Sequence, residues 1–335
     1  MAHLSIILVN WNCIAFTEQC IESILSADAG IDYEVIVVDN ASADSPCQRL
    51  LDRFPWVQLI HSPENIGFGQ ANNLGVRNSS GEILFFLNPD TLVIGDALHR
   101  MLGTLSEVAQ AGAIGCRLLN PDRTLQTSSV QRFPSVFNQV LSVAWLQRRW
   151  PSLPLWGKQA LYHKGSLLIH EVDVVSGAAL MVRRCVFEEA GRFNPEYFMY
   201  AEEVDLCYAI HCAGWKVLHC SDAQIVHFGG QSTSQRENGF VDVTMRDSVC
   251  RFFLRTRGIS YAVIYRFCLL MSAILRITAL GCVSPLFGLA GSPDRRLAAA
   301  RAFRKWLRIA RWSIGMESVT ERFVSPAVNW PPAGN

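Results

Sequence analysis

Three strand-like runs of the sequence end in polar side chains that could bind a ligand. These side chains are Asn10, Trp11 and Asn12 after the first run, Asp39 and Asn40 after the second, and Asn88 and Asp90 after the third. Ligands of open α/β sheets bind beyond the carboxyl ends of the strands, so we expect the three groups to surround one site. The alternative for Asp90 is a turn residue, because Asn88 and Pro89 form a turn signal.

The chemistry that these side chains suggest is phosphate binding through a metal ion. The first run is followed by neither a GxGxxG turn nor a GxxxxGK[ST] loop. Their absence there argues against a dinucleotide-dependent oxidoreductase and a P-loop hydrolase. Without a Lys or a Gly-rich loop to neutralise phosphates, a divalent cation held by a carboxylate is the natural substitute.

The elements that must position these residues follow from the apolar pattern of the first 120 residues. A helix-like stretch with Phe16, Cys20 and Ile24 on one face follows the first run, and residues 44–54 suit a short helix. Strands are predicted at residues 4–9, 33–39, 57–62, 83–88 and 111–119. Continuous apolar strands separated by helices predict an α/β fold, with a mostly parallel sheet covered on both faces.

The later part of the chain is less regular. Residues 120–172 are rich in Trp, Arg and Pro and predict a loop or a lid. Further elements are predicted as a strand at residues 173–184, a helix at 202–214, and two short strands at 215–220 and 223–228.

The charge of the chain is distributed unevenly. The formal net charge of the 335 residues is +1, but residues 251–311 hold twelve Lys or Arg and one acid, Asp294. The rest of the chain holds 18 basic and 28 acidic residues. This asymmetry predicts an anionic partner for the C-terminal arm, either a membrane surface or nucleic acid.

The arm has the pattern of an interfacial helix. In residues 295–312 the basic side chains Arg301, Arg304, Lys305, Arg308 and Arg311 share one face, and the apolar side chains Ala299, Phe303, Trp306, Leu307 and Ala310 share the other. We therefore expect residues 259–312 to contact an anionic membrane surface. Packing on the protein's own core is the alternative. A membrane span is not favoured, because Arg266 and Arg276 interrupt the apolar stretch, and nucleic acid is not expected without a groove-reading motif.

Two further features favour a reduced, cytoplasmic chain. The eleven cysteines form no CxxC pair or zinc-ligand spacing. The apolar run at the N-terminus is too short for a signal peptide and has no basic region before it.

Seven motifs together resemble a known family. Between about residues 4 and 235 they occur in the order VNWN, VVDNASAD, NIGFGQANNLG, FFLNPDT, SGAALMVRR, FMYAEEVDLC and VHFGGQS. Through them the chain resembles the family 2 glycosyltransferases, most closely the bacterial rhamnosyltransferase branch. The resemblance implies a GT-A fold, a nucleotide-diphosphosugar donor and an inverting transfer. It implies a glycosyltransferase domain at residues 1–240, with the donor bound by 1–120 and the acceptor by 121–240, and a helical region at 241–335.

The resemblance assigns the donor site to the strand ends described above. Asp39 takes the position of the family's acid that hydrogen-bonds the nucleoside, although an Asx turn is its alternative role. Asn10 and Trp11 would flank the base. The remaining residues expected around the nucleotide and the sugar are Asn12, Asn40, Gly67, Phe68, Asn72, Asn73, Asn88, Gly177 and Ala178.

The resemblance also implies a metal site. Asp90 takes the metal-binding position of the family's DxD motif, which here reads Asn88-Pro89-Asp90. His227 takes the position of the histidine that completes the site, although an isolated His is more often a surface or core residue. Oxygen ligands suit Mg²⁺ or Mn²⁺, and an imidazole favours Mn²⁺.

The expected catalytic base departs from the family pattern. Where the family shows Glu-Asp-x-Asp-Leu at a helix start, this chain has Glu202, Glu203, Val204, Asp205 and Leu206. The Glu at position 203 therefore replaces the usual base, with Glu202 and Asp205 as supporting acids, and the alternative is that all three only cap the helix. Val174 also replaces a common Trp, which puts the identity of the acceptor in doubt.

The predicted function is transfer of a sugar, plausibly L-rhamnose from dTDP-rhamnose, to a lipid-linked glycan or a polysaccharide precursor at the inner face of the cell membrane. The alternatives are a transferase that uses a UDP-hexose or UDP-galactofuranose, and a degenerate protein that only binds nucleotide-sugars. Competent side chains at the base, metal and nucleotide positions count against the degenerate protein.

Overall fold

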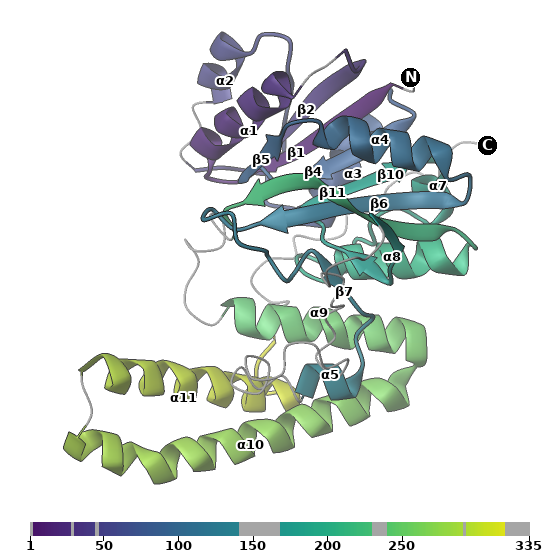
Figure 1. Ribbon diagram of the computed structural model, residues 1–335. Helices are drawn as coiled ribbons and strands as arrows, with labels where there is room; N and C mark the ends of the chain where they lie inside the picture. The colour runs from purple at the N-terminus through teal and green to yellow at the C-terminus, as the bar shows by residue number, and fades with distance from the viewer. Residues whose placement is uncertain are drawn as a thin grey trace.

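The computed structural model describes residues 3–27, 30–43, 47–140, 168–229, 240–290 and 293–318. Its larger part is a sheet with helices on both faces, and a layer of three long helices lies beneath it in Figure 1. This is the α/β architecture that the apolar runs predict.

The main sheet has nine strands in the order β3-β2-β1-β4-β10-β6-β11-β5, and β8 pairs with β11. These strands are β1 (Leu4–Asn10), β2 (Tyr33–Asp39), β3 (Gln58–His61), β4 (Ile83–Leu87), β5 (Thr91–Ile94), β6 (Ala111–Leu119), β8 (Ile169–Glu171), β10 (Ala179–Arg183) and β11 (Lys216–His227). Strands β1 to β4 are parallel to one another, as are β6 and β11, whereas β10 is antiparallel to both β4 and β6. A small second sheet pairs β7 (Val130–Gln131) with β9 (Val174–Val175).

Two apolar clusters cover the two faces of the sheet. In β1, Leu4, Ile6 and Leu8 point to one face and Ile7 and Val9 to the other, as the period of two in a strand requires. The first face packs against α1 (Ile14–Ser26), α2 (Cys47–Arg53) and α4 (Ala97–Glu107), and the second against α3 (Phe68–Arg77), α7 (Arg184–Glu189) and α8 (Glu202–Cys212). Burial on both faces explains the nearly continuous apolar runs in the sequence.

The C-terminal helices share the second cluster. Helices α9 (Phe240–Arg257), α10 (Ile259–Ala290) and α11 (Pro293–Ser313) form the lower layer in Figure 1, with the short α5 (Val136–Val140) beside α10. Phe252 of α9, Tyr265 of α10 and Trp312 of α11 are buried together with residues of α8. The helical layer is therefore packed on the sheet layer through one apolar core.

Several predicted elements are confirmed and two are corrected. The strands at residues 33–39 and 111–119 have the predicted bounds. The prediction of two strands at 215–220 and 223–228 was wrong, because β11 runs through both and absorbs the break as an irregular register between Cys220 and Gln224. The strand predicted at 173–184 divides at Ser176 into β9 and β10.

Some predictions fall partly on residues outside the described ranges. Of the helix predicted at residues 44–54, the described part is α2, and residues 44–46 lie outside. Of the loop or lid predicted at 120–172, residues 141–167 lie outside, and the described part includes β7 and α5. The VHFGGQS motif is described up to Gly229.

Strand register decides which polar residues meet. Asn10 pairs directly with Asp39 at the carboxyl ends of β1 and β2. At the other side of the sheet, His227 pairs with Thr91 in the antiparallel pair of β11 and β5, which brings it beside Asp90. Asn10 and Asp39, 29 positions apart in the chain, thus meet at the same edge of the sheet as Asp90 and His227, which are more than 130 positions apart.

Candidate active site

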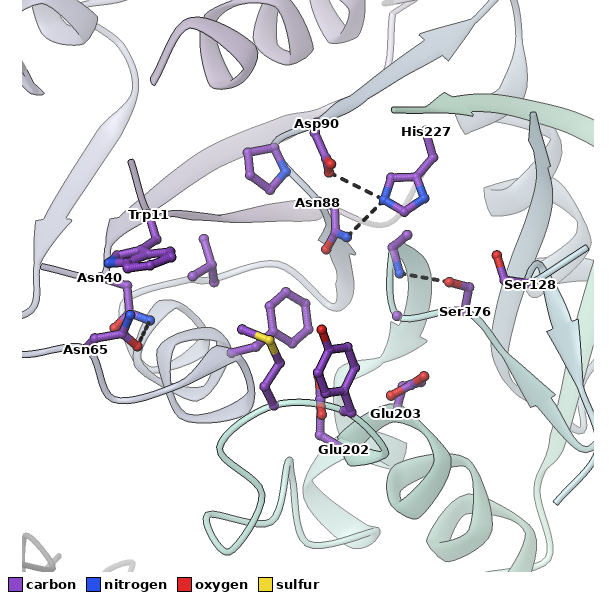
Figure 2. A pocket seen from close by; sticks show the side chains of 17 residues that line it. Trp11, Asn40, Asn65, Asn88, Asp90, Ser128, Ser176, Glu202, Glu203 and His227 are labelled. Atoms are coloured by element: carbon purple, nitrogen blue, oxygen red, sulfur yellow. Dashed lines mark hydrogen bonds and ion pairs between the residues drawn. The ribbon is translucent and has the colours of Figure 1, made fainter. Parts of the chain in front are cut away.

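The carboxyl ends of the strands open onto a cavity of about 340 Å³. Figure 2 shows its main polar and aromatic residues, which are Trp11, Asn40, Asn65, Asn88, Asp90, Ser128, Ser176, Glu202, Glu203 and His227. Asp90 and His227 lie on one wall, Glu202 and Glu203 lie on the opposite wall, and Trp11 lies at one end between them. The predicted residues Phe68, Gly177 and Ala178 also belong to the lining, together with Val9, Pro89, Met199 and Tyr200.

The end of the cavity near Trp11 is a flat wall of one aromatic ring and two amides. Asn40 Nδ2 donates a hydrogen bond to Asn65 Oδ1 at 3.1 Å, and the backbone N–H of Ile66 donates to Asn40 Oδ1 at 3.0 Å. These bonds fix the loop before α3 against the end of β2. An indole face beside oriented amide groups is suited to stacking and hydrogen bonding with a planar base.

Asn10 and Asp39 are buried beneath this wall and are not part of the cavity lining. Asn10 Nδ2 donates to Asp39 Oδ1 at 3.1 Å, and Asn10 Oδ1 accepts from Thr17 Oγ1 at 3.1 Å. Asn12 also lies outside the lining, where its Oδ1 accepts the backbone N–H of Ala43 at 2.7 Å. All three side chains tie the strand ends together in this structure, and their contact with a nucleotide stays a prediction.

The start of α3 fastens a second loop to the site. Gly67 has a φ of +82°, and a Cβ there would lie 2.3 Å from the backbone oxygen of Phe198, so only glycine fits. The backbone N–H of Phe68 donates to that same oxygen at 3.0 Å, and Asn73 Nδ2 donates to the backbone oxygen of Phe193 at 2.7 Å. The segment from Phe193 to Phe198, which leads to the acids of α8, is thereby held against α3.

Only part of the Gly- and Asn-rich stretch at residues 65–73 lines the cavity. The Phe68 ring reaches the cavity, whereas Gly67, Asn72 and Asn73 do not line it. Asn72 is buried, and its Nδ2 donates to the backbone oxygen of Phe68 at 3.0 Å. The contacts of these residues with ribose and diphosphate also stay predictions.

Asp90 and His227 lie together on the wall that faces Glu202 and Glu203, and both are side chains of a type that can ligate a metal ion. Asp90 Oδ1 lies 3.4 Å from His227 Nε2, and both side chains are largely buried. Asn88 Nδ2 lies 3.4 Å from the same imidazole nitrogen. Asp90 is therefore placed beside a second potential ligand and is not simply a turn residue.

Gln126 sets the tautomer of His227. Its Oε1 lies 2.8 Å from His227 Nδ1, while its Nε2 donates to Asn120 Oδ1 at 3.3 Å and to the backbone oxygen of His227 at 3.4 Å. Those two donations fix the orientation of the amide, so its oxygen must accept the proton of Nδ1. In neutral His227 the lone pair of Nε2 then lies on the side of Asn88 Nδ2 and Asp90, and the bond from Nδ1 to Gln126 resembles the outer hydrogen bond of an imidazole ligand.

This geometry fits a divalent cation. Two ligand atoms at about 2.1 Å from one cation and roughly 90–110° apart lie about 3.0–3.4 Å from each other, and the pair here is separated by 3.4 Å. Within the described ranges no three His, Cys, Asp or Glu side chains converge on one point. A cation on Asp90 and His227 would therefore keep open positions for oxygen atoms of a ligand.

A strained turn presents the two glutamates. Tyr200 and Ala201 have φ values of +70° and +64° just before α8 begins at Glu202. The left-handed region costs residues other than glycine about 1–3 kcal/mol each, and such strain is concentrated at functional sites. The turn directs Glu202 and Glu203 into the cavity wall.

Burial changes the acidity of both glutamates. It raises the pKa of Glu203, although the backbone N–H groups of Glu203 and Val204 act against this rise. Burial also raises the pKa of Glu202 well above its usual value, and the charge of Glu203 adds to the effect. Two adjacent carboxyl groups that do not ionise equally easily can divide their roles, with Glu203 as base and Glu202 as a neutral neighbour.

Gly177 makes room for the side chain of Glu203. A Cβ at this position would lie 3.3 Å from the Cβ and 3.6 Å from the Cγ of Glu203. The Glu203 stem therefore rests against the backbone of Gly177, and any larger side chain there must displace it.

Asp205 faces away from the cavity. Its Oδ1 accepts from Arg255 Nε at 2.7 Å and from the Tyr197 hydroxyl at 3.3 Å. Burial raises the pKa of Asp205, and the nearby Arg255 guanidinium opposes that rise. The side chain joins α8 to α9 and is placed as a support of the loop, consistent with the weaker role expected for it.

Several lining or supporting residues were not singled out from the sequence, although Asn65 and Ser176 begin the motifs NIGFGQANNLG and SGAALMVRR. Ser128 and Ser176 line the end of the cavity near Glu203, and Asn65 lies beside Trp11 (Figure 2). Gln126, which orients His227, belongs to the stretch read as a loop or lid. No spacing rule connects residues 126 and 227, because their contact depends on how β6 and β11 pair.

Comparison with known proteins identifies the family. The sequence model described as glycosyl transferase family 2 matches residues 5–189, more than half of the chain. The chain belongs to this family. It is a glycosyltransferase, and the earlier resemblance is confirmed.

The similar family 2 proteins include two rhamnosyltransferases. The chain is 31% identical over 212 residues to the N-acetylglucosaminyl-diphospho-decaprenol L-rhamnosyltransferase of Mycobacterium tuberculosis, covering 60% of this chain and 68% of the relative. It is 24% identical over 230 residues to Rhamnosyltransferase WbbL of Escherichia coli, covering 67% and 82%.

The fold matches solved glycosyltransferases. The mannosyltransferase PcManGT of Pyrobaculum calidifontis, solved with GDP-Man and Mn²⁺, superposes with a TM-score of 0.53 at 18% identity, covering 93% of this chain and 84% of that chain. The expected GT-A fold of this family 2 glycosyltransferase is thereby confirmed.

Proposed function

We propose that this glycosyltransferase moves L-rhamnose from dTDP-rhamnose to a hydroxyl group of a lipid-linked glycan or polysaccharide precursor, with inversion at the anomeric carbon. The observation that carries the proposal is one cavity in which Asp90 and His227 face Glu202 and Glu203. The names of the mycobacterial and Escherichia coli relatives support the sugar. The name of the mycobacterial relative supports an acceptor sugar carried on a polyprenol diphosphate.

The shape of the cavity supports one orientation of the donor. Its base would stack at the end formed by Trp11, Asn40 and Asn65, above the buried Asp39, and its diphosphate would extend toward Asp90 and His227. A Mn²⁺ or Mg²⁺ ion held by Asp90 and His227 would stabilise the negative charge that develops on the departing nucleoside diphosphate. Gln126 holds the proton on Nδ1 and so leaves the Nε2 lone pair for the ion, which would replace the contact of Nε2 with Asn88 Nδ2.

Glu203 acts as the general base. It removes the proton of the acceptor hydroxyl while that oxygen forms a bond to C1 of the sugar and the bond from C1 to the diphosphate oxygen breaks. The raised pKa of Glu203 increases its affinity for that proton. The position of the two acids opposite the diphosphate wall suits attack from the face opposite the leaving group.

A lipid-linked acceptor would account for the basic, apolar C-terminal helices. A lipid-linked acceptor resides in a membrane, and we propose that the enzyme associates peripherally with the cytoplasmic face through residues 259–312. Helices α10 and α11, which contain these residues, share one apolar core with α9 and with α8, which carries Glu203. An enzyme held in this way would meet its acceptor at the membrane surface.

The first experiment is calorimetric titration of dTDP, UDP and GDP into the intact protein, with and without Mn²⁺. We expect dTDP to bind most tightly, Mn²⁺ to strengthen its binding, and Asp90→Ala to remove the effect of the metal. Asp96→Ala is the matched control, because Asp96 is an exposed acid six residues away that pairs with Arg100. Binding that ignores both the metal and Asp90→Ala would contradict the proposed site.

A transfer assay then tests the reaction itself. The enzyme is incubated with an N-acetylglucosaminyl-diphospho-lipid and, in separate reactions, dTDP-L-rhamnose, a UDP-hexose or UDP-galactofuranose. A mass increase of one deoxyhexose only with dTDP-L-rhamnose supports the proposal, and NMR of the new anomeric centre tests inversion. Transfer only from a UDP-sugar would overturn the proposed donor.

A further inference from the structure

Helix α10 carries an apolar stripe on its exposed side. The α10 stripe consists of Ile259, Val263, Ile264, Phe267, Met271, Ile274 and Leu275, whose exposed fractions range from 44% to 70%. Spacings of three and four residues place these side chains on one face of the helix, over a length of about 24 Å. Single exposed apolar residues are ordinary, but a continuous row of this size marks an interaction surface.

The two charges of this part of α10 are turned away from the stripe. The Arg266 guanidinium lies 4.4 Å from the ring centre of Trp312, and that of Arg276 lies 4.2 Å from the ring centre of Trp306, so both stack on α11. Arg266 Nε also donates to the backbone oxygen of Ser313 at 3.1 Å. These contacts leave the α10 stripe without a charged side chain.

Helix α11 has an apolar and a basic side next to this stripe. Phe303, Leu307 and Ile314 are exposed by 39%, 42% and 56%, on the side of α11 that carries Trp306 and so faces α10. The opposite side carries the basic residues predicted from the sequence. A cavity of about 400 Å³, the α11 cationic cavity, is lined by Asp242 of α9, by the small or apolar residues Ala302 and Leu307, and by Arg301, Arg304, Lys305, Arg308 and Arg311.

We propose that the α10 stripe, with Phe303 and Leu307, inserts into the lipid–water boundary of an anionic bilayer, parallel to the membrane plane. The α11 cationic cavity then lies at the level of the lipid phosphates. The proposal rests on the proposed membrane association and names the surface that makes it. A long helix with one apolar face and basic residues near its edge has the charge and shape that such an interface requires.

The packing argues for an in-plane position. The part of α10 from Ile259 to Cys282, 24 residues, is long and apolar enough to cross a membrane. However, its inner face, with Ala262, Tyr265 and Leu269, is buried in the core shared with α8 and α9. Helix α11 packs beside it with exposed arginines, and a charged side chain is costly in the centre of a bilayer. Half-immersion buries the stripe and leaves those charges in water.

Vesicle flotation of the full-length protein tests the stripe. The vesicles contain phosphatidylcholine with about 30 mol% phosphatidylglycerol. The phosphatidylglycerol supplies the negative surface charge of an anionic leaflet. We expect Phe267→Glu/Leu275→Glu to lower the partition coefficient on the order of 100-fold, because two apolar side chains lose their burial. Leu25→Glu is the control, since Leu25 is exposed by 41% on α1, on the far side of the sheet.

Further measurements separate the membrane surface from the proposed donor site. Thermal unfolding and Mn²⁺-dependent dTDP binding of each variant show that the fold and the donor site are intact. A second pair, Phe267→Ser/Leu275→Ser, tests the stripe without adding charge. If both pairs float like the wild type, the stripe is not the membrane surface, whatever the donor proves to be.

Two measurements test the orientation and the cations. Alkaline carbonate is expected to release the protein from the vesicles, and retention would overturn the in-plane position in favour of a span. Arg304→Ala/Arg311→Ala is expected to abolish the difference between anionic and pure phosphatidylcholine vesicles. If that difference persists at its wild-type size, the α11 cationic cavity does not bind lipid phosphates.

Discussion

Replacement of Glu203 by Gln tests the proposed mechanism most directly. The substitution keeps the length of the side chain and its packing on Gly177, but removes the group that accepts the proton. A general base contributes about 10²–10⁴-fold to a rate, which corresponds to roughly 2.7–5.4 kcal/mol of activation free energy. We expect kcat to fall by that factor. KM for the donor should change little, because Asp90 and His227, the proposed diphosphate end of the donor site, lie on the other wall of the cavity.

The assay follows release of dTDP at saturating acceptor between pH 5 and pH 9. Only ionised Glu203 can accept a proton, so the wild-type rate should rise with pH through the pKa of Glu203, which burial has raised. This rising limb should be absent in Glu203→Gln. Glu203→Asp withdraws the carboxylate by one methylene group, a displacement above 1 Å that can cost about 100-fold in kcat.

Glu202→Gln is the matched control. Because burial and the charge of Glu203 hold the pKa of Glu202 well above its usual value, Glu202 is expected to be neutral at working pH, and Gln resembles that neutral form. Its kcat should stay within about tenfold of the wild type, less than a general base contributes. The assignment would be refuted if Glu203→Gln retained full kcat, or if Glu202→Gln lost as much activity as Glu203→Gln.

Three further outcomes follow from the site. Gly177→Ala should displace the Glu203 stem by a few tenths of an ångström, so kcat should fall while the calorimetric affinity for dTDP is unchanged. Gln126→Leu removes the acceptor that holds the Nδ1 proton of His227, and Mn²⁺ affinity, titrated in the presence of dTDP, should weaken about 10–100-fold. The third outcome concerns stability. Above its usual pKa of 4.5, Glu202 must take up a proton when the chain folds, so wild-type stability should fall as pH rises from there through the raised folded pKa. Glu202→Gln should remove that part of the pH dependence in urea unfolding measured at pH 5 and pH 7.5; an unchanged dependence would contradict the raised pKa.

The strands could be predicted from the sequence because their signal is local. The limits of the strands at residues 33–39 and 111–119 can be read from the sequence, because each apolar run ends at polar residues and the strand ends there too. Residues 215–228 misled the prediction because Ser221 and Asp222 interrupt the apolar pattern. Pairing of β11 with β6 on both sides of that interruption keeps the strand continuous, and only the partner strand can supply those bonds.

The candidate site shows the same division. The sequence alone, through its ordered motifs, determined the family, the candidate acids Asp90 and Glu203 that the structure brings to one cavity, and the two faces of residues 295–312. Residue type and spacing within one segment carry that information. Tertiary structure decided that Asn10 and Asp39 lie beneath the cavity wall, that Gln126 orients His227, and that Asp205 pairs with Arg255. It also decided that the two arginines of α10, Arg266 and Arg276, stack on tryptophans of α11, so that the exposed stripe of α10 is apolar. Each of these depends on strand order, register or helix packing between distant segments, which the period of a single segment does not encode.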